Sequence, residues 1–259
     1  MGKDGSVTHE PAAGPHQPRL APIVGSYVGD PDVAAEWDKR YSEQDQMWSG
    51  NPNGTLVAEV AGLAPGRALD VGCGEGADAI WLAGLGWDVT ALEVSGVALE
   101  RAARHAADAG VTVRWVHAGM VEAALPPASF DLVSAQYPVL ARTPELVAER
   151  AVIDAVVPGG VLLFVHHADM EHRHDHGHGH DHGQHHGDDH GDDHGDATDG
   201  HVDEHAFDPA DYVWPTDMVT ALGDDWAIEV DERRPRVAPE SGAGAGHNDD
   251  LVLRARRLR

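Results

Sequence analysis

From Arg67 onward, short apolar runs alternate with helical stretches, and glycines separate them. The expected strands cover residues 68–71, 87–92, 111–116, 130–135 and 161–165, and the expected helices between them cover 77–85, 97–109 and 144–157. Strands that alternate with helices form parallel sheets, and a strand that is apolar throughout, such as 161–165, is buried on both faces. The alternation therefore predicts an α/β domain with helices on both faces of a parallel sheet.

Further elements flank this core. Helical character is expected at 33–41, 55–62 and 216–222, and strands at 226–231 and 251–257. The last two strands are close enough in sequence to pair antiparallel. Residues 1–30 are rich in Pro, Gly and charge and are predicted to be a disordered leader. The rest of the chain, 31–259, has the length of one domain, with one interruption.

That interruption is a low-complexity segment. Residues 166–205 hold 14 of the 19 histidines, 12 Asp or Glu and a single Arg. Almost nothing apolar is present, so 168–206 are predicted to be a disordered insertion. Neutral imidazoles bind Zn²⁺, Ni²⁺, Cu²⁺ and Co²⁺. The candidate ligands follow an alternating pattern: His172, His174, His176, His178, His180 and His182. So many equivalent ligands select no fixed geometry, and metal binding here is either functional or incidental.

Composition also excludes some partners. The formal charge is −26, much of it from the insertion, and phosphate binding would need clustered Lys and Arg. We therefore expect no nucleic-acid partner. The lone Cys73 forms no internal disulfide, and no apolar run approaches the roughly 18 to 20 residues of a membrane span. The expected location is the cytoplasm, with a small-molecule substrate and no membrane partner; the oligomeric state is not predicted.

A glycine loop follows the first core strand. Gly72, Gly74 and Gly76 allow a sharp turn and a close approach of ligand to backbone, and the next helix offers free N–H groups. Glu93 ends the following strand, where a carboxylate can accept both hydroxyls of a ribose. Because Ala77 completes a G-x-G-x-x-A pattern, the loop alone leaves both NAD and another nucleoside open.

The wider context favours one of them. The stretch ALDVGCGEGADAIWLAGLGWDVTALEVS resembles motif I and the acidic second-strand end of class I S-adenosylmethionine-dependent methyltransferases. FDLV at 130–133 and VPGG at 157–160 match later landmarks of that family. The resemblance covers residues 33–259 apart from the insertion. It implies a Rossmann-like, seven-stranded, mostly parallel sheet whose last strand is antiparallel, with S-adenosylmethionine as cofactor.

The resemblance also implies site residues. Asp70 would lie near the methionine moiety of the cofactor and Glu93 would hold its ribose. The segments WDKRY and WSGNP are similar to the lid of thiopurine- and tellurite-type enzymes, which would place Tyr41 and Trp48 over the cofactor. The alternative is that these rings, with Trp37, only pack a helix onto the sheet.

One departure from the family lies after the third strand. The stretch HAGMVE at 117–122 has no acid at the family's usual adenine position, so backbone around Gly119 and Met120 is expected there. The full set expected at the cofactor is Tyr41, Trp48, Asp70, Gly72, Gly74, Glu93, Val94, Gly119, Met120 and Gln136.

The expected function is methyl transfer to a small-molecule nucleophile. Such a displacement needs alignment and desolvation, and a general base only where the nucleophile must lose a proton. The catalytic residues are not predicted, with Tyr137 and His166 as candidates at strand ends. The alternative is that Gln136 only positions the methionine part and that His166 belongs to the metal loop. The lid resemblance points to a thiol, chalcogen or similar metabolite. The alternative function is a metal-binding or metal-buffering protein on a degenerate methyltransferase scaffold.

Overall fold

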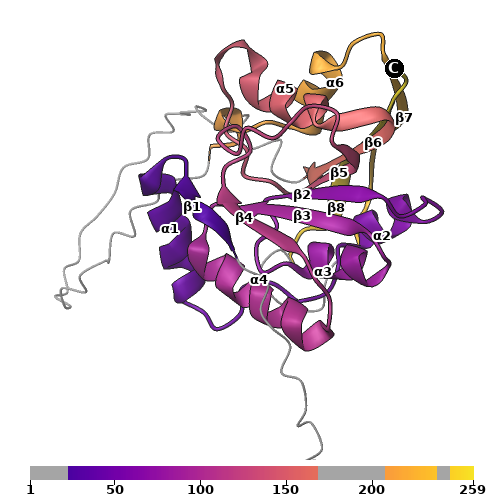
Figure 1. The fold of residues 1–259 in the computed structure, drawn as a ribbon. Coiled ribbons are helices and arrows are strands. Elements are labelled where there is room, and N and C mark those ends of the chain that lie inside the picture. The colour runs from indigo at the N-terminus through magenta and orange to yellow at the C-terminus, as the bar shows by residue number, and fades with distance from the viewer. Residues whose placement is uncertain (1–22, 169–207, 238–245) are drawn as a thin grey trace, which may run out of the picture.

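The structure is a computed structural model that describes residues 23–168, 208–237 and 246–259. Within these ranges the chain forms one eight-stranded sheet, in the order β1-β4-β3-β2-β5-β6-β8-β7 (Figure 1). The strands are β1 (Val24–Val28), β2 (Arg67–Val71), β3 (Asp88–Glu93), β4 (Arg114–Ala118), β5 (Phe130–Gln136), β6 (Val156–His167), β7 (Trp226–Pro235) and β8 (Asp249–Arg257).

The pairing confirms a mostly parallel, Rossmann-like sheet with an antiparallel last strand. Each neighbouring pair from β1 to β6 is parallel. Strand β8 lies between β6 and β7 and is antiparallel to both. Consequently the carboxyl ends of β2 to β6 lie along one edge of the sheet, together with the beginning of β8. That edge is where open α/β sheets bind ligands.

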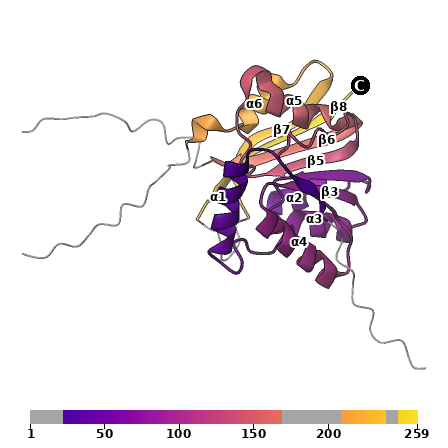
Figure 2. The same cartoon turned by 60° about the vertical axis from the view of Figure 1, so that its left-hand side comes forward.

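Helices cover both faces, as the alternation predicted. The two views place α2 (Gly54–Val60), α3 (Ala77–Gly84) and α4 (Gly96–Ala109) on one side of the sheet (Figures 1 and 2). On the other side lie α5 (Val147–Asp154), which follows the short 3-10 helix η1 (Pro144–Leu146), and α6 (Pro215–Ala221), which follows the 3-10 helix η3 (Pro209–Asp211). Helix α1 (Pro31–Ser42) packs against α4. None of the helices in the described ranges is long and apolar enough to span a membrane.

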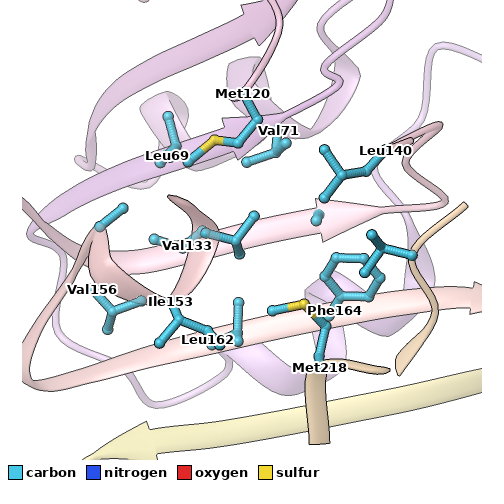
Figure 3. Packing of buried hydrophobic residues seen from close by; sticks show 14 of the residues in the cluster. Leu69, Val71, Met120, Val133, Leu140, Ile153, Val156, Leu162, Phe164 and Met218 are labelled. Atoms are coloured by element: carbon cyan, nitrogen blue, oxygen red, sulfur yellow. The ribbon is translucent and has the colours of Figure 1, made fainter. Parts of the chain in front are cut away.

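The sheet separates two apolar cores, and β6 contributes to both. Leu162 and Phe164 belong to the core beneath α5 and α6 (Figure 3). Leu163 and Val165 belong to the core on the side of α2, α3 and α4. Because successive strand residues point to opposite faces, the uninterrupted apolar sequence of this strand fills both layers at once.

Several boundaries differ from the sequence-based expectation. Strand β1 lies within the predicted leader, so the sheet has eight described strands rather than seven. Strand β4 begins at Arg114 because Gly110 ends α4 at φ 70° and the N–H of Val111 still donates to Ala106. Helix α5 ends at Asp154, and β6 already pairs with β5 at Val156.

The two-sided core gives a stability prediction. Leu163 is fully buried at the centre of β6, so Leu163→Ala leaves a cavity and should lower the free energy of unfolding by about 2–5 kcal/mol. Ile228 on β7 is 47% exposed, and Ile228→Ala should cost about 1 kcal/mol or less. Urea denaturation of both variants measures the difference; equal losses would contradict the assigned burial.

Candidate functional site

A cavity of about 670 Å³ lies at the carboxyl edge of the parallel strands. The strand ends bring their last residues to its wall. Every residue expected at the cofactor lines this cavity: Tyr41, Trp48, Asp70, Gly72, Gly74, Glu93, Val94, Gly119, Met120 and Gln136.

The glycine loop is fastened to the end of β3. The amides of Gly72 and Cys73 both donate to the carbonyl of Leu92 at 2.9 Å. The amide of Gly74 donates to Oε2 of Glu93, also at 2.9 Å. Gly72 and Gly74 have φ of 73° and 52°, in the left-handed region that glycine adopts without steric cost. Backbone bend and carboxylate therefore share one crevice.

The Glu93 carboxylate is held in place by backbone amides. Its Oε1 accepts hydrogen bonds from the amides of Val94 and Ser95, each at 2.9 Å, while Oε2 accepts from Gly74. Burial raises the pKa of Glu93, and these three amides oppose that rise. Each carboxylate oxygen can accept more than one hydrogen bond, so the side chain is oriented without being saturated.

Near Glu93, Asp70 contributes a second carboxyl group, and one of its oxygens lacks a hydrogen-bond partner. The side chain is 2% exposed, and its Oδ2 makes no hydrogen bond. Burial and the nearby carboxylates of Asp78 and Glu93 hold the pKa of Asp70 well above its ordinary value. Gln136, which ends the neighbouring strand β5, is also buried and its Oε1 lacks a partner. Two buried acceptors that line a cavity without donors are complementary to a cationic group.

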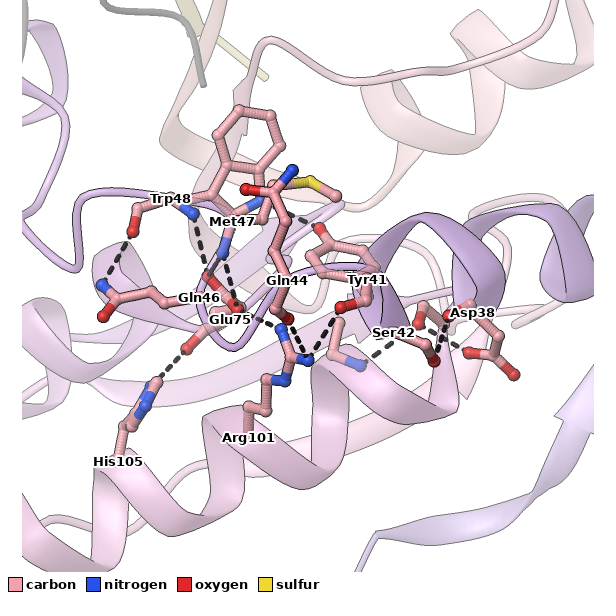
Figure 4. Close-up of polar contacts among 12 residues, drawn as sticks. Asp38, Tyr41, Ser42, Gln44, Gln46, Met47, Trp48, Glu75, Arg101 and His105 are labelled. Carbon is pink, nitrogen blue, oxygen red and sulfur yellow. Dashed lines mark hydrogen bonds and ion pairs between the residues drawn. The ribbon is translucent and has the colours of Figure 1, made fainter. Parts of the chain in front are cut away.

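The segment 41–48, which was expected to form a lid and which we call the lid segment, is fixed to the same loop through Glu75. This carboxylate accepts hydrogen bonds from the amides of Met47 and Trp48 at 3.0–3.2 Å and forms a 2.8 Å ion pair with Arg101 (Figure 4). Arg101 also donates to the carbonyls of Tyr41 and Gln44 at 2.7 Å. The position of the lid is therefore set by a buried, charge-assisted network.

The aromatic side chains of the lid lie directly on the loop. Nε1 of Trp48 donates to the hydroxyl of Tyr41 at 2.9 Å. A Cβ atom at Gly74 would lie 2.9 Å from that hydroxyl and 3.1 Å from the indole nitrogen. A larger residue at Gly74 would displace both rings. Trp37 packs beside Tyr41, with ring centroids 6.0 Å apart, and also lines the cavity.

The part of the cavity that follows β4 contains an acid that was not predicted from the sequence. Gly119 and Met120 line this part, and the carboxylate of Glu122 lies beside Gly119. Glu122 lines the cavity as well, a few residues beyond the position where the family's acid was sought. Tyr27, from the unexpected strand β1, also lines the cavity, and its ring lies tilted by 47° against that of His117 with the centroids 4.8 Å apart.

The two candidate catalytic residues have different positions. Tyr137 lines the cavity, but its hydroxyl is bound to Asp250 and burial raises its pKa, which argues against a role as general base. His166 does not line the cavity: it is buried against Trp214, with ring centroids 3.9 Å apart. The next residue, His167, lines it instead, because neighbouring strand residues point to opposite faces.

The remaining lining residues come from distant parts of the chain. Asp78, which accepts two hydrogen bonds from Asn53 at 2.7 Å, follows the glycine loop, and Arg236 follows β7. Asp78 could have been predicted to reach the cavity, because it lies in the first turn of the helix that follows the glycine loop. For Arg236 no local signal existed, because its position depends on how β7 and β8 close the sheet.

The six histidines expected to bind metal, His172 to His182, lie outside the described residues. Among residues 23–168, 208–237 and 246–259, no group of three or more His, Cys, Asp or Glu is arranged to hold a metal ion.

Comparisons with known proteins agree with this geometry. Residues 68–160 match the family described as Methyltransferase domain. An uncharacterized methyltransferase of Mycobacterium tuberculosis is 34% identical over 122 residues, which cover 47% of this chain and 61% of that protein. A ubiquinone biosynthesis O-methyltransferase of Burkholderia multivorans is 34% identical over 138 residues, 51% of this chain and 58% of that protein. The chain thus spans about three fifths of the length of these relatives.

Solved structures extend the likeness over most of the chain. One comes from work on the conversion of a disulfide bond into a thioacetal group during echinomycin biosynthesis, with a TM-score of 0.58, 22% identity, and coverage of 87% of this chain and 92% of that one. TehB from Haemophilus influenzae has a TM-score of 0.55 and 14% identity, covering 85% and 66%. At these identities the likeness shows the Rossmann-like fold alone and carries no information on the substrate.

The network around Glu75 gives a prediction about the lid. In Glu75→Gln a neutral amide replaces the charged acceptor, so the amides of Met47 and Trp48 should exchange hydrogen at least about tenfold faster. Hydrogen-exchange mass spectrometry of the lid measures the change. Glu43→Gln, at an exposed position on the same segment, is the matched control; equal exchange in both variants would refute the network's role.

Proposed function

We propose that the protein is an S-adenosylmethionine-dependent methyltransferase that acts on a small-molecule nucleophile. The observation that carries this proposal is the convergence of the Gly72–Gly76 loop with the carboxylates of Glu93 and Asp70 on one cavity. The methyltransferase family match over residues 68–160 supports it independently of the geometry.

The residues of the cavity fit this cofactor. Glu93, oriented by three amides, would accept the two ribose hydroxyls. Asp70 and Gln136, each with a buried oxygen that lacks a partner, would accept the ammonium group of the methionine part. Val94 and Met120, which follow β3 and β4, would contact the adenine, with Glu122 close to its amino group. An acidic, unsaturated site favours this positively charged molecule over the pyrophosphate of NAD.

The reaction would need little from the protein beyond placement. When bound, the sulfonium supplies an electrophilic methyl group, and the electrons of its broken carbon–sulfur bond remain on the neutral sulfur. Tyr41 and Trp48 would cover the crevice and exclude water, and the loop would fix the angle of approach. A cavity of about 670 Å³ has the size of sites for small molecules.

The role of Glu93 can be tested by binding. Glu93→Gln keeps the shape of the side chain and removes its charge, so the affinity for S-adenosylhomocysteine should fall about 10- to 100-fold. Asp88→Asn, at the exposed beginning of the same strand, is the matched control and should bind normally. Titration calorimetry gives both values. Wild-type protein that binds NAD at micromolar concentrations and no S-adenosylhomocysteine would refute the proposal.

Asp70 predicts a pH dependence. Its raised pKa means that the carboxylate takes up a proton at a higher pH than an ordinary Asp, and it then no longer attracts an ammonium group. Affinity for S-adenosylhomocysteine should therefore fall as the pH drops from about 8 to about 5. Asp70→Asn should bind more weakly at the upper end and show a flatter profile. Asp131→Asn, on the neighbouring strand and away from the cavity, should follow the wild type; a steep wild-type-like profile in Asp70→Asn would exclude the assigned role.

A further inference from the structure

The cavity continues beyond the residues assigned to the cofactor. Glu93 ends β3 and Asp70 lies on β2, while the next strands along the same edge are β5 and then β6. Strands lie about 4.8 Å apart, so His167 at the end of β6 is about 14 Å along the sheet from Glu93. The wall there is formed by Tyr137, His167 and Arg236, which we call the β6 end of the cavity.

These side chains form an ordered stack. The ring of His167 lies between those of Tyr137 and His247, with centroid distances of 4.0 and 3.9 Å and interplanar angles of 15° and 13°. The guanidinium carbon of Arg236 lies 4.6 Å from the centroid of the Tyr137 ring. The Nε of Arg236 also donates to the Tyr137 hydroxyl at 3.0 Å. That hydroxyl in turn donates to Asp250 at 3.0 Å.

The backbone of Tyr137 is strained to make this arrangement. Its φ of 54° is unfavourable for a residue with a side chain, and the bond from its N–H to the carbonyl of Val165 at 2.8 Å holds it there. Asp250 is fixed on its far side by a 2.7 Å hydrogen bond from Thr55. Such strain persists where surrounding contacts over-determine it, and it is concentrated at functional sites.

The charge of the β6 end is opposite to that of the glycine loop. Asp70, Asp78 and Glu93 line the cavity near the loop, whereas the charged side chain that lines the β6 end is Arg236. Its carboxylate partner Asp250, 3.8 Å away, is fully buried behind the cavity wall.

His167 adds no charge to this end. Burial, together with the neighbouring His247, Arg236 and His166, lowers the pKa of His167 to about 2, so its imidazole is neutral under physiological conditions. Its Nδ1 is buried without a hydrogen-bond partner. Among the residues that the structure describes, the charged and titratable groups around the stack are the Arg236 cation, the buried Asp250 carboxylate with Arg234 also acting on it, the neutral imidazoles of His167 and His166, His247 and the protonated Tyr137 phenol.

We propose that the β6 end, formed by Tyr137, His167 and Arg236, binds the methyl acceptor and selects an acid that reacts as its anion, a thiolate or an acidic phenolate, over an amine. This assignment rests on the proposed methyltransferase function. Arg236 would stabilise the negative charge of the bound acceptor, and the neutral rings, whose faces are covered by one another, by His247 and by Arg236, would present their edges to it.

An amine is disfavoured by the same groups. An alkyl amine is protonated near neutral pH and must lose a proton before it has a lone pair to react. His167 resists protonation, the Tyr137 hydroxyl already donates to Asp250, and Arg236 repels an ammonium group. An ionised thiol or phenol has released its proton to water beforehand. Its lone pair forms the new bond to the methyl carbon, while the electrons of the broken carbon–sulfur bond stay on sulfur.

The test uses 4-nitrophenol, whose absorbance reports its ionisation, and the full-length protein saturated with S-adenosylhomocysteine. We expect binding to lower the apparent pKa of the probe, so that the phenolate band grows at constant pH. Arg236→Gln should remove most of this shift, Arg236→Lys should restore it in part, and Arg233→Gln, an exposed arginine on β7, should leave it unchanged.

Turnover with S-adenosylmethionine provides the second readout. Thiophenol and 4-nitrophenol should be methylated and benzylamine should not, and Arg236→Gln should lower kcat/KM for the two acids at least about tenfold, a charge-assisted contact being worth that much. Failure of the probe to bind, an unchanged or raised probe pKa, or preferential methylation of benzylamine would overturn the inference. Affinity for S-adenosylhomocysteine is measured separately in every variant. Its absence in the wild type would refute the proposed function itself, and its loss only in Arg236→Gln would show a structural role for Arg236 and overturn the assignment.

Discussion

The hydrogen bond from the Gly74 amide to the Glu93 carboxylate is the contact on which the rest of the site depends. It joins the loop after β2 to the end of β3 and gives the backbone bend and the carboxylate a common orientation. The adjacent Glu75 accepts hydrogen bonds from the amides of Met47 and Trp48. A few consecutive residues thus form the floor of the cavity and also position its cover. Glycine is needed at position 74 because two aromatic side chains lie against the backbone there.

The distribution of charge along the sheet edge separates two tasks. Near the loop, Asp70, Asp78 and Glu93 are buried close together, and burial raises the pKa of each. Such a cluster is costly to the free protein and is relieved by a cation, as expected of a binding site that is not optimised for stability. At the other end, Arg236 faces the cavity and its counter-charge is withdrawn behind the wall. A cationic methyl donor and an anionic acceptor would each meet a complementary surface, and their mutual attraction would favour the approach of one to the other.

Much of the fold and of the cofactor end could be predicted from the sequence, because both are encoded locally. Strand and helix periodicity determined the order of elements, and a residue at the end of a parallel strand reaches the ligand edge whatever its neighbours are. Strand β1 was missed because a short edge strand in a polar, Pro- and Gly-rich context has no periodic signal. The candidate His166 lies one position before the lining residue His167, and one position in a strand reverses the face to which a side chain points. Arg236 and Asp250 could not be placed at all, since their positions depend on the antiparallel closure of β7 and β8.

The bond from Thr55 to Asp250 joins residues 195 positions apart, and Asp250 also holds Tyr137 in place. Contacts of such sequence separation form late, because the chain entropy of closing a long loop must be overcome first. The contact between Gly74 and Glu93 closes a much shorter stretch of chain, because these residues are 19 positions apart. A growing or refolding chain would therefore complete the crevice between Gly74 and Glu93 while the wall formed by Tyr137 and Arg236 is still missing. If that wall selects the methyl acceptor as proposed, selectivity would appear only when the final strand has docked, so the last part of the fold to assemble would determine what is modified.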